Sequence, residues 1–320
     1  MSKELVLLNG LLRTVAKPSA RYMAHRAHRI ELHRRAMCRA AGLLAVPEQV
    51  RIEPQAIAHF SGEWVHPMKR QSPERVVLYI PGGAFSLMSP ITHRGITTRL
   101  ARYTGARVLA INYRKVPEHP YPSALEDSLA TYEWLLEQGI RAENLVVAGD
   151  SAGGNLTLSM LQMLRDRGMP LPAAAACFSP WADLAGTGLS MRINRHRDAM
   201  VPFEHIRDGA LAYANGIALD DPRVSPLYGD FSGLPPMLVH AGDTEMLASD
   251  ATRLGQIARA AGVEVELKLW RNTPHAFQLF AGVIPQGRRS LSKTASFFAR
   301  HWATPATQDA PARTAMSAAV

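Results

Sequence analysis

The feature that most constrains the fold is an alternation that begins near residue 72. Short apolar runs typical of strands take turns with longer segments whose apolar residues recur at helical spacing. Strands separated by helices predict βαβ units, and hence a mostly parallel sheet with helices on both faces. The expected strands are Val76–Ile80, Val108–Ile111, Leu145–Ala148, Ala174–Phe178, Met237–His240 and Val265–Trp270. The expected helices cover about 93–104, 122–138, 152–167, 249–261 and 289–301.

Three segments depart from this alternation. Residues 1–50 are predicted to form a helical cap segment, because Leu, Met and Ala recur three to four positions apart. The core is expected to span 51–302, and a stretch at about 185–230 has no convincing strand. We expect that stretch to be a helical insertion that forms a lid with the N-terminal helices. Residues 303–320 are rich in Ala, Thr and Pro without periodicity, which predicts a disordered tail.

The net charge of +9 raises the question of a nucleic-acid partner. Much of the positive charge lies in residues 13–39, where arginines and lysines recur at helix-like intervals. No DNA- or RNA-binding motif accompanies them, so we interpret them as a solvated basic face and expect no nucleic-acid partner.

The cysteine content and the apolar runs limit which metal sites, cofactors and cellular locations are expected. Two cysteines far apart, Cys38 and Cys177, give neither a disulfide framework nor a metal-binding cluster, and we expect no metal and no cofactor. There is no apolar run of about 18 residues, so we expect no membrane span. The first residues lack a good signal-peptide cleavage site, and a cytoplasmic location is the expectation.

The motif that carries chemistry lies in the stretch LVVAGDSAGGN at residues 145–155. An apolar strand runs into Gly149-Asp150-Ser151-Ala152-Gly153, and a helix pattern follows. This is G-x-S-x-G in the context that a nucleophile elbow requires. The turn is so tight that the residues two positions from Ser151 must lack side chains. It would present the Ser151 hydroxyl at a helix N-terminus, where a developing anion is favoured.

A serine hydroxyl needs a base, and the base needs an acid to orient it. His275 follows the expected strand at 265–270 in the segment RNTPHAF, so it is the candidate base. The acid should lie in the loop after the strand PMLVHAG, which offers Asp243 and Glu245. Asp250 is expected in the following helix, and local reasoning does not choose between Asp243 and Glu245.

Acyl transfer also needs N–H donors for the carbonyl oxygen that becomes negative. One is expected from Ala152, the residue after the nucleophile. The others are expected from the glycine-rich loop YIPGGAF at 79–85, whose candidate donors are Gly82, Gly83 and Ala84. Pro81 has no N–H of its own, and its fixed φ would stiffen the loop.

Several ordered motifs resemble the hormone-sensitive-lipase-like branch of the α/β-hydrolases, the bacterial esterases of that group. They are GDSAGGN at 149–155, NYRKVPEHPYPSALED at 112–127, SPWADL at 179–184 and PHAF at 274–277. The resemblance covers about residues 72–300 and implies an α/β-hydrolase fold with a helical cap. The oxyanion loop of that family usually begins H-G-G-G, so Pro81 stands where a histidine is common. The family's usual donors fall on Gly83 and Ala84, and we expect the oxyanion hole to survive.

The resemblance also indicates the acid and the reaction. The segment DTEMLASD at 243–250 is similar to a family form D-E-x-L-L-x-D, which favours Glu245 over Asp243. The implied activity is cofactor-free hydrolysis of short- to medium-chain carboxylesters through an acyl-enzyme intermediate. Lactone or amide hydrolysis by the same machinery, or a non-catalytic ligand-binding role, are the alternatives. A small-molecule ester is the implied substrate, and a homodimer is the assembly seen in many members.

Overall fold

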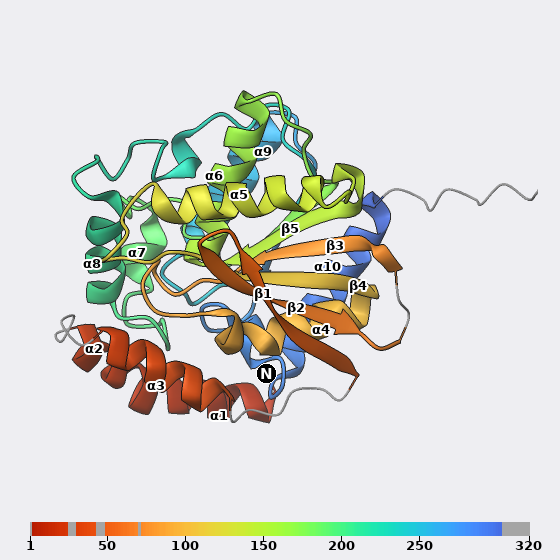
Figure 1. The fold of residues 1–320 in the computed structure, drawn as a ribbon. Coiled ribbons are helices and arrows are strands. Elements are labelled where there is room, and N and C mark those ends of the chain that lie inside the picture. Colours follow the sequence, from red (N-terminus) through yellow and green to blue (C-terminus); the bar gives the residue numbers. More distant parts are fainter. Residues whose placement is uncertain (1, 25–29, 43–48, 70–71, 303–320) are drawn as a thin grey trace, which may run out of the picture.

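One mixed sheet organises the molecule (Figure 1). The structure is a computed structural model that describes residues 2–24, 30–42, 49–69 and 72–302. The order of its strands is β1-β2-β4-β3-β5-β6-β7-β8; β1 and β2 are antiparallel to their neighbours, and the rest are parallel. Their bounds are β1 Val50–Ile57, β2 Phe60–Pro67, β3 Ser72–Ile80, β4 Ala106–Asn112, β5 Leu145–Asp150, β6 Ala174–Phe178, β7 Met237–Gly242 and β8 Val265–Trp270.

The six strands predicted from the apolar runs are β3 to β8, so the predicted α/β architecture is confirmed. The sequence reading missed β1 and β2. Strand β1 reads VRIEPQAI, in which charged and polar residues and Pro54 break the apolar run that marks a buried strand. A proline fits there because β1 lies at the edge of the sheet, where one side of the strand has no partner to bond.

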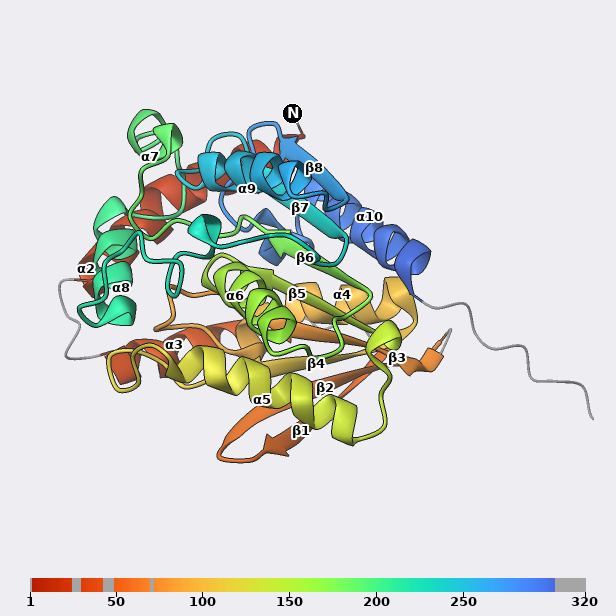
Figure 2. The same ribbon diagram turned by 90° about the horizontal axis from the view of Figure 1, so that it is seen from above.

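Helices cover both faces of the sheet, as Figure 2 shows. On one face lie α4 (Arg94–Thr104) and α10 (Pro285–His301), and on the other lie α5 (Ser123–Glu137), α6 (Ala152–Asp166) and α9 (Ala248–Ala260). The helices predicted by periodicity correspond to these five. Every residue of β5 and β6 is buried, because these central strands have a helix layer on each side.

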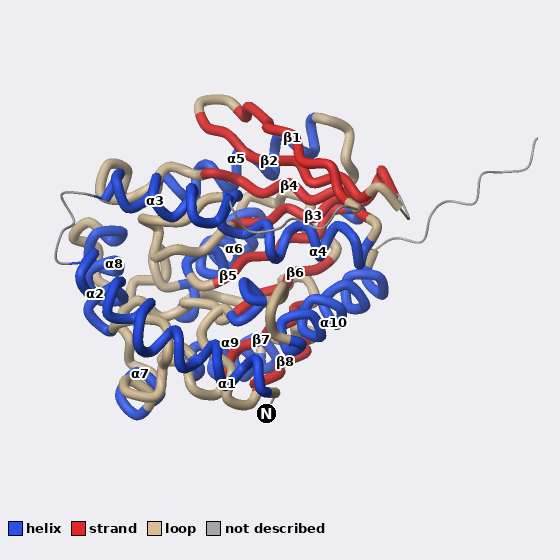
Figure 3. The backbone as a smooth tube through the Cα atoms, turned by 90° about the horizontal axis from the view of Figure 1, so that it is seen from below, coloured by secondary structure: helices blue, strands red, loops and turns tan. Residues whose placement is uncertain are grey.

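Two further groups of helices lie along one side of the molecule. The chain begins with α1 (Lys3–Leu11), a π-helical turn (Leu12–Ala16), α2 (Lys17–Ala24) and α3 (Ile30–Gly42). Residues 179–236, all of them described, contain α7 (Leu189–Ile193) and α8 (Phe203–Ala214) and no strand. Helix α2 runs beside α8, so the start of the chain meets the segment between β6 and β7 (Figures 1 and 3).

The described residues contain neither a membrane-spanning helix nor a group of side chains that could hold a metal ion. None of their helices is both long and apolar enough to cross a membrane. None of their histidines, cysteines and carboxylates form a group of three or more that could hold a metal ion. The predicted disordered tail at 303–320 lies outside the described residues.

Candidate active site

Ser151 lies in the sharp turn between β5 and α6, with a φ of +52°. Its N–H donates to the carbonyl of Phe178, which fixes the turn on the neighbouring strand. Both motif glycines are required by space. A Cβ at Gly149 would lie 2.3 Å from the carbonyl oxygen of Gly153, and one at Gly153 would lie 1.9 Å from that of Ile80. The G-x-S-x-G sequence therefore makes possible a turn that no bulkier pair of residues could form.

Ser151 and His275 line one cavity of about 270 Å³, which we call the Ser151 cavity. Its wall comes from loops after several parallel strands, from the segment between β6 and β7, and from the N-terminal helices. Carboxyl ends of parallel strands are the usual place for such a site. The lining is mostly apolar and includes Ala16, Ala20, Met37, Leu87, Met88, Trp181, Met200, Val201, Pro202, Ile206, Leu247 and Leu279.

Glu245 is the carboxylate that contacts His275. The Nδ1 atom of His275 lies 2.6 Å from Oε2 of Glu245, and both side chains are buried. The other oxygen of Glu245 accepts from the Gly242 N–H at 2.8 Å, which orients the carboxylate. Burial favours the neutral imidazole, but the hydrogen bond and the charge of Glu245 outweigh it and raise the pKa of His275.

Asp243, the alternative acid, points elsewhere. Its Oδ1 accepts from the N–H of Asn272 at 2.7 Å, so it closes the turn after β8 instead of contacting His275. Asp250 lies in α9, as expected, and its Oδ2 accepts from the N–H groups of Ala182 and Asp183. The contacts of His275 thus distinguish Glu245 from Asp243, a choice that local sequence reasoning left open.

A second buried carboxylate, Asp198, braces the acid loop, and the sequence reading did not find it. Its Oδ2 accepts from the N–H of Met246 at 3.0 Å. Its Oδ1 accepts from the N–H groups of Met200 and Val201 at 2.9 and 3.0 Å. One side chain therefore joins the residue after Glu245 to two residues that line the Ser151 cavity. Asp198 lies in a segment without periodicity, so no pattern distinguished it from a solvated charge.

The glycine-rich loop after β3 lies beside Ser151, and it corrects one prediction. The N–H of Gly82 donates to Oδ1 of Asp150 at 3.1 Å, so Gly82 is not free to act as an oxyanion donor. Within the described part of the chain, the N–H groups of Gly83, Ala84 and Ala152 have no protein acceptor. Gly83 has a φ of +113°, and a Cβ there would lie 2.7 Å from the Met88 nitrogen, so the loop requires glycine.

Other parts of the fold hold the loop in place around Pro81. The carbonyl of Pro81 accepts from the hydroxyl of Tyr113 at 2.9 Å. Asp150, which holds Gly82, also accepts from the hydroxyl of Tyr79 at 2.6 Å and lies 3.1 Å from Nε2 of His93. Burial opposes ionisation of Asp150, but His93 and these hydrogen bonds outweigh it and lower the pKa of the carboxyl.

Known proteins share this fold and much of this sequence. A family model described as alpha/beta hydrolase fold matches residues 77–279. An acetyl-hydrolase from Streptomyces hygroscopicus is 41% identical over 258 residues, which are 81% of this chain and 85% of the relative. An esterase from Acinetobacter venetianus is 35% identical over 285 residues, 89% of this chain and 92% of the relative.

Solved structures agree with these sequence relatives. The crystal structure of an esterase from the bacterial hormone-sensitive lipase family superposes with a TM-score of 0.86 at 34% identity, covering 95% of this chain and 99% of that one. The family resemblance predicted from the motifs in residues 72–300 is thereby confirmed, and the structural match extends over 95% of this chain. The chain belongs to the α/β-hydrolase superfamily and, within it, to the hormone-sensitive-lipase-like family.

Proposed function

We propose that the protein hydrolyses short- to medium-chain carboxylesters with Ser151 as nucleophile, His275 as base and Glu245 as the orienting acid. The observation that carries the proposal is the buried His275–Glu245 pair, joined at 2.6 Å, on the wall of the cavity that Ser151 also lines. A histidine bonded through Nδ1 to a carboxylate presents Nε2 to a serine, which is the arrangement of serine hydrolases.

The chemistry then runs in two halves. Ser151 Oγ attacks the ester carbonyl while His275 takes its proton, and the collapse of the tetrahedral intermediate releases the alcohol, protonated by His275. Water, deprotonated by His275, attacks the acyl-enzyme and frees the acid and Ser151. Glu245 holds the ring in one tautomer and stabilises the imidazolium that forms in each half.

The N–H groups of Gly83, Ala84 and Ala152 are the proposed oxyanion donors. They come from two turns whose backbones are held by Asp150, by Tyr113 and by the packing of Gly153 against Ile80. Fixed donors need no reorganisation when charge develops, which is why each such donor can contribute about 3–4 kcal/mol of barrier lowering.

The size and lining of the cavity support small apolar acyl groups. A volume of about 270 Å³ falls just below the range of drug-sized ligand sites, which is about 300–1,000 Å³. The acetyl-hydrolase from Streptomyces hygroscopicus points the same way. We propose that the N-terminal helices and the segment at 185–230 form a cap over the cavity, since both contribute to its wall.

The test is hydrolysis of p-nitrophenyl esters from acetate to palmitate by the wild type and by Ser151→Ala. We expect a maximum at short acyl chains and loss of turnover in the variant, with an unchanged melting temperature. Hydrolysis that persists in Ser151→Ala would overturn the assignment of the nucleophile. A folded wild type that cleaves none of the esters would overturn the proposed substrate class.

Two expectations about the setting stay predictions. A homodimer is expected from the family, and sedimentation of the purified protein would measure it. A cytoplasmic location is the second, and fractionation of the producing cells would test it.

A further inference from the structure

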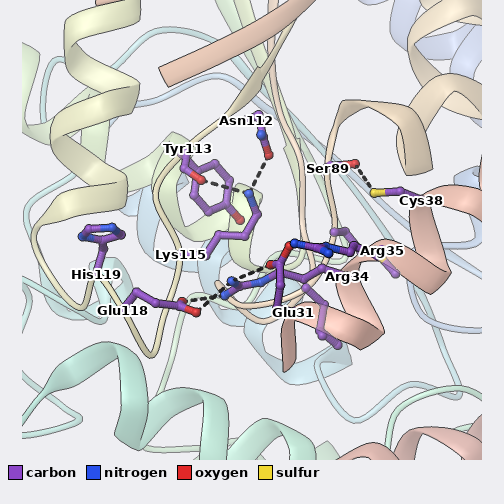
Figure 4. Close-up of a pocket in the computed structure, with 12 residues that line it drawn as sticks. Glu31, Arg34, Arg35, Cys38, Ser89, Asn112, Tyr113, Lys115, Glu118 and His119 are labelled. Carbon is purple, nitrogen blue, oxygen red and sulfur yellow. Dashed lines mark hydrogen bonds and ion pairs between the residues drawn. The ribbon is translucent and has the colours of Figure 1, made fainter. Parts of the chain in front are cut away.

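A second hollow of about 430 Å³ lies between α3 and the loop after β4 (Figure 4). We call it the Lys115 pocket. Helix α3 contributes Glu31, Arg34, Arg35 and Cys38 to its wall, and the other side is formed by 87–89 and by residues of the stretch 112–119. Leu87 and Met88 also line the Ser151 cavity, so the two hollows share a wall.

Lys115 is an ammonium in this pocket that has no counter-ion among the described residues. Its Nζ donates to Oδ1 of Asn112 at 2.6 Å and to the carbonyl of Tyr113 at 2.9 Å, and both acceptors are neutral (Figure 4). An ammonium has three N–H donors, so one is left over. No ion pair joins Lys115 to a carboxylate of the described residues.

The neighbouring charges are already paired. Arg34 bonds both oxygens of Glu118, at 3.0 and 2.8 Å, and also donates to the carbonyls of Ser86 and Val116. Arg35 pairs with Glu31 at 2.9 Å at the exposed rim. The cationic and anionic side chains of the pocket therefore cancel except at Lys115.

Lys115 is half-buried, and this makes its unpaired charge costly. Burial, followed by the charge of Arg34, lowers the pKa of Lys115 to about 8, while Cys38 of α3, Asp127 of α5 and Glu118 act in the opposite direction. His119 also faces the pocket. A ligand that brought one negative charge would supply the missing partner.

We propose that the Lys115 pocket binds a small organic monocarboxylate, with the carboxylate on Nζ of Lys115 and the apolar part against Leu87 and Met88. A monoanion matches the single uncompensated cation, whereas a phosphate dianion would leave an excess negative charge beside Glu118. The volume suits a small molecule. This site uses neither Ser151 nor His275, so it stands independently of the proposed hydrolysis.

Calorimetric titration of the full chain with butyrate and with butyramide tests the proposal. Butyramide has a similar shape without the charge. We expect butyrate to bind the wild type at least tenfold more tightly than butyramide, because a charge-assisted hydrogen bond is lost in the amide. We also expect proton uptake from the buffer on binding at pH 9, because the bound carboxylate favours the ammonium form of a lysine whose pKa is about 8.

Two variants locate the site, and one controls for charge. Lys115→Met removes the cation, and Asn112→Asp places a carboxylate 2.6 Å from Nζ without changing the shape of the side chain. Both should lose at least tenfold in butyrate affinity, whereas Lys293→Met, at an exposed position on α10, should bind as the wild type does. Melting temperatures show whether each variant is folded, and Asn112→Asp keeps the test valid if Lys115→Met is not. A butyrate affinity that neither Lys115→Met nor Asn112→Asp lowers, or butyrate binding that is undetectable in the wild type, would overturn the proposal.

Discussion

The Ser151 cavity and the Lys115 pocket share the wall formed by Leu87 and Met88, but their basic groups have different surroundings. His275 is buried, and Lys115 is half-buried. In the first, Glu245 bonds His275 at 2.6 Å, and Asp198 and Asp150 add negative charge nearby. In the second, the partners of Lys115 among the described residues are neutral: two oxygens and the ring of Tyr113, whose centroid lies 5.1 Å from Nζ. As a result the pKa of His275 is raised and that of Lys115 is lowered, although burial acts downward on both.

This difference has a functional meaning. A group that must accept and return a proton in every cycle benefits from a permanent partner, because its geometry is then fixed before the substrate arrives. A group that is to bind an anion benefits from having no permanent partner, because the ligand then gains the whole interaction. The following changes remove or create such partners, from the largest expected effect to the smallest.

Removing the partner of His275 should have the largest effect. We expect Glu245→Gln to lower kcat by about 10³–10⁴-fold, because an amide can hold the imidazole in the wrong tautomer and carries no charge to stabilise the imidazolium. Asp243→Asn is the matched control, since Asp243 bonds the Asn272 N–H and not His275. We expect it to change kcat less than tenfold. Steady-state hydrolysis of p-nitrophenyl butyrate measures both, and an equal loss in the two variants would contradict the assignment.

Because Lys115 has no anionic partner among the described residues, its lowered pKa should affect how the free energy of unfolding depends on pH. Between pH 8 and 10.5 the unfolded chain keeps the Lys115 proton and the folded chain loses it, so the free energy of unfolding rises with pH. The lowering of the pKa from 10.5 to about 8 corresponds to about 3 kcal/mol. We expect the wild type to gain about this much relative to Lys115→Met between pH 7.5 and 10.5.

Urea unfolding of the two proteins across this pH range measures the gain. Groups common to both proteins cancel in the difference, so the difference isolates Lys115. The same comparison with Lys293→Met, at an exposed position on α10, is the control for the removal of a lysine as such. If the difference in unfolding free energy between the wild type and Lys115→Met does not change with pH, the pKa of Lys115 is not lowered by folding. The contrast between the Ser151 cavity and the Lys115 pocket would then be wrong.

The residues of the Ser151 cavity could be predicted from the sequence more fully than those of the Lys115 pocket, and the reason is physical. Ser151 lies in a turn that demands glycines at fixed positions, and His275 follows a strand, so both leave a pattern in the sequence. Glu245 needed the resemblance in the segment 243–250, because two carboxylates lay within reach. The sheet was predicted from β3 to β8 for the same reason: buried parallel strands are continuous apolar runs.

What remained hidden depends on which distant segments meet. Asp198 reaches the acid loop only because the segment between β6 and β7 folds back over the sheet. Glu118, a carboxylate of the same pocket as Lys115, pairs with Arg34 from α3, which is distant in the sequence. Gly82 was expected to donate to an oxyanion, and only the position of Asp150 shows that its N–H is taken. None of these relations leaves a periodic signal in the chain.

Neutralising Asp198 should lower the pKa of His275 while leaving its hydrogen bond to Glu245 in place. Asp198 is one of the charges that raise the pKa of His275, so we expect Asp198→Asn to lower it. Hydrolysis requires neutral His275, and the acid limb of the kcat/KM profile should therefore move to lower pH. The amide also cannot accept from all three N–H groups, so we expect a loss of about 1–3 kcal/mol in the free energy of unfolding.

The pH profile separates this effect from a purely structural one. A loosened cavity would lower kcat/KM at every pH and leave the acid limb in place. Asp243→Asn removes a nearby charge that is not among those acting on His275, and it should leave the limb unmoved. A limb that stays in place in Asp198→Asn as well would show that Asp198 does not contribute to the pKa of His275.

The smallest effect is expected at Pro81, in the oxyanion loop after β3. The loop is supported by Tyr113, whose hydroxyl bonds the carbonyl of Pro81 while its own carbonyl accepts from Lys115. Oδ1 of Asp150 accepts from the N–H of Gly82, the residue after Pro81. The same oxygen lies 3.1 Å from Nε2 of His93. These contacts involve the backbone of residues 81 and 82, so they do not depend on which side chain stands at 81.

We therefore expect Pro81→His to change kcat/KM for p-nitrophenyl butyrate by less than tenfold, although a histidine is common at this position in the family. Tyr113→Phe removes one hydrogen bond to the loop and should cost about 1 kcal/mol, or roughly fivefold in kcat. A rise of several orders of magnitude in Pro81→His would mean that the loop is impaired as it stands. A backbone held by Tyr113 and Asp150 argues for the smaller change, because the donors Gly83 and Ala84 already have the conformation that the histidine would brace.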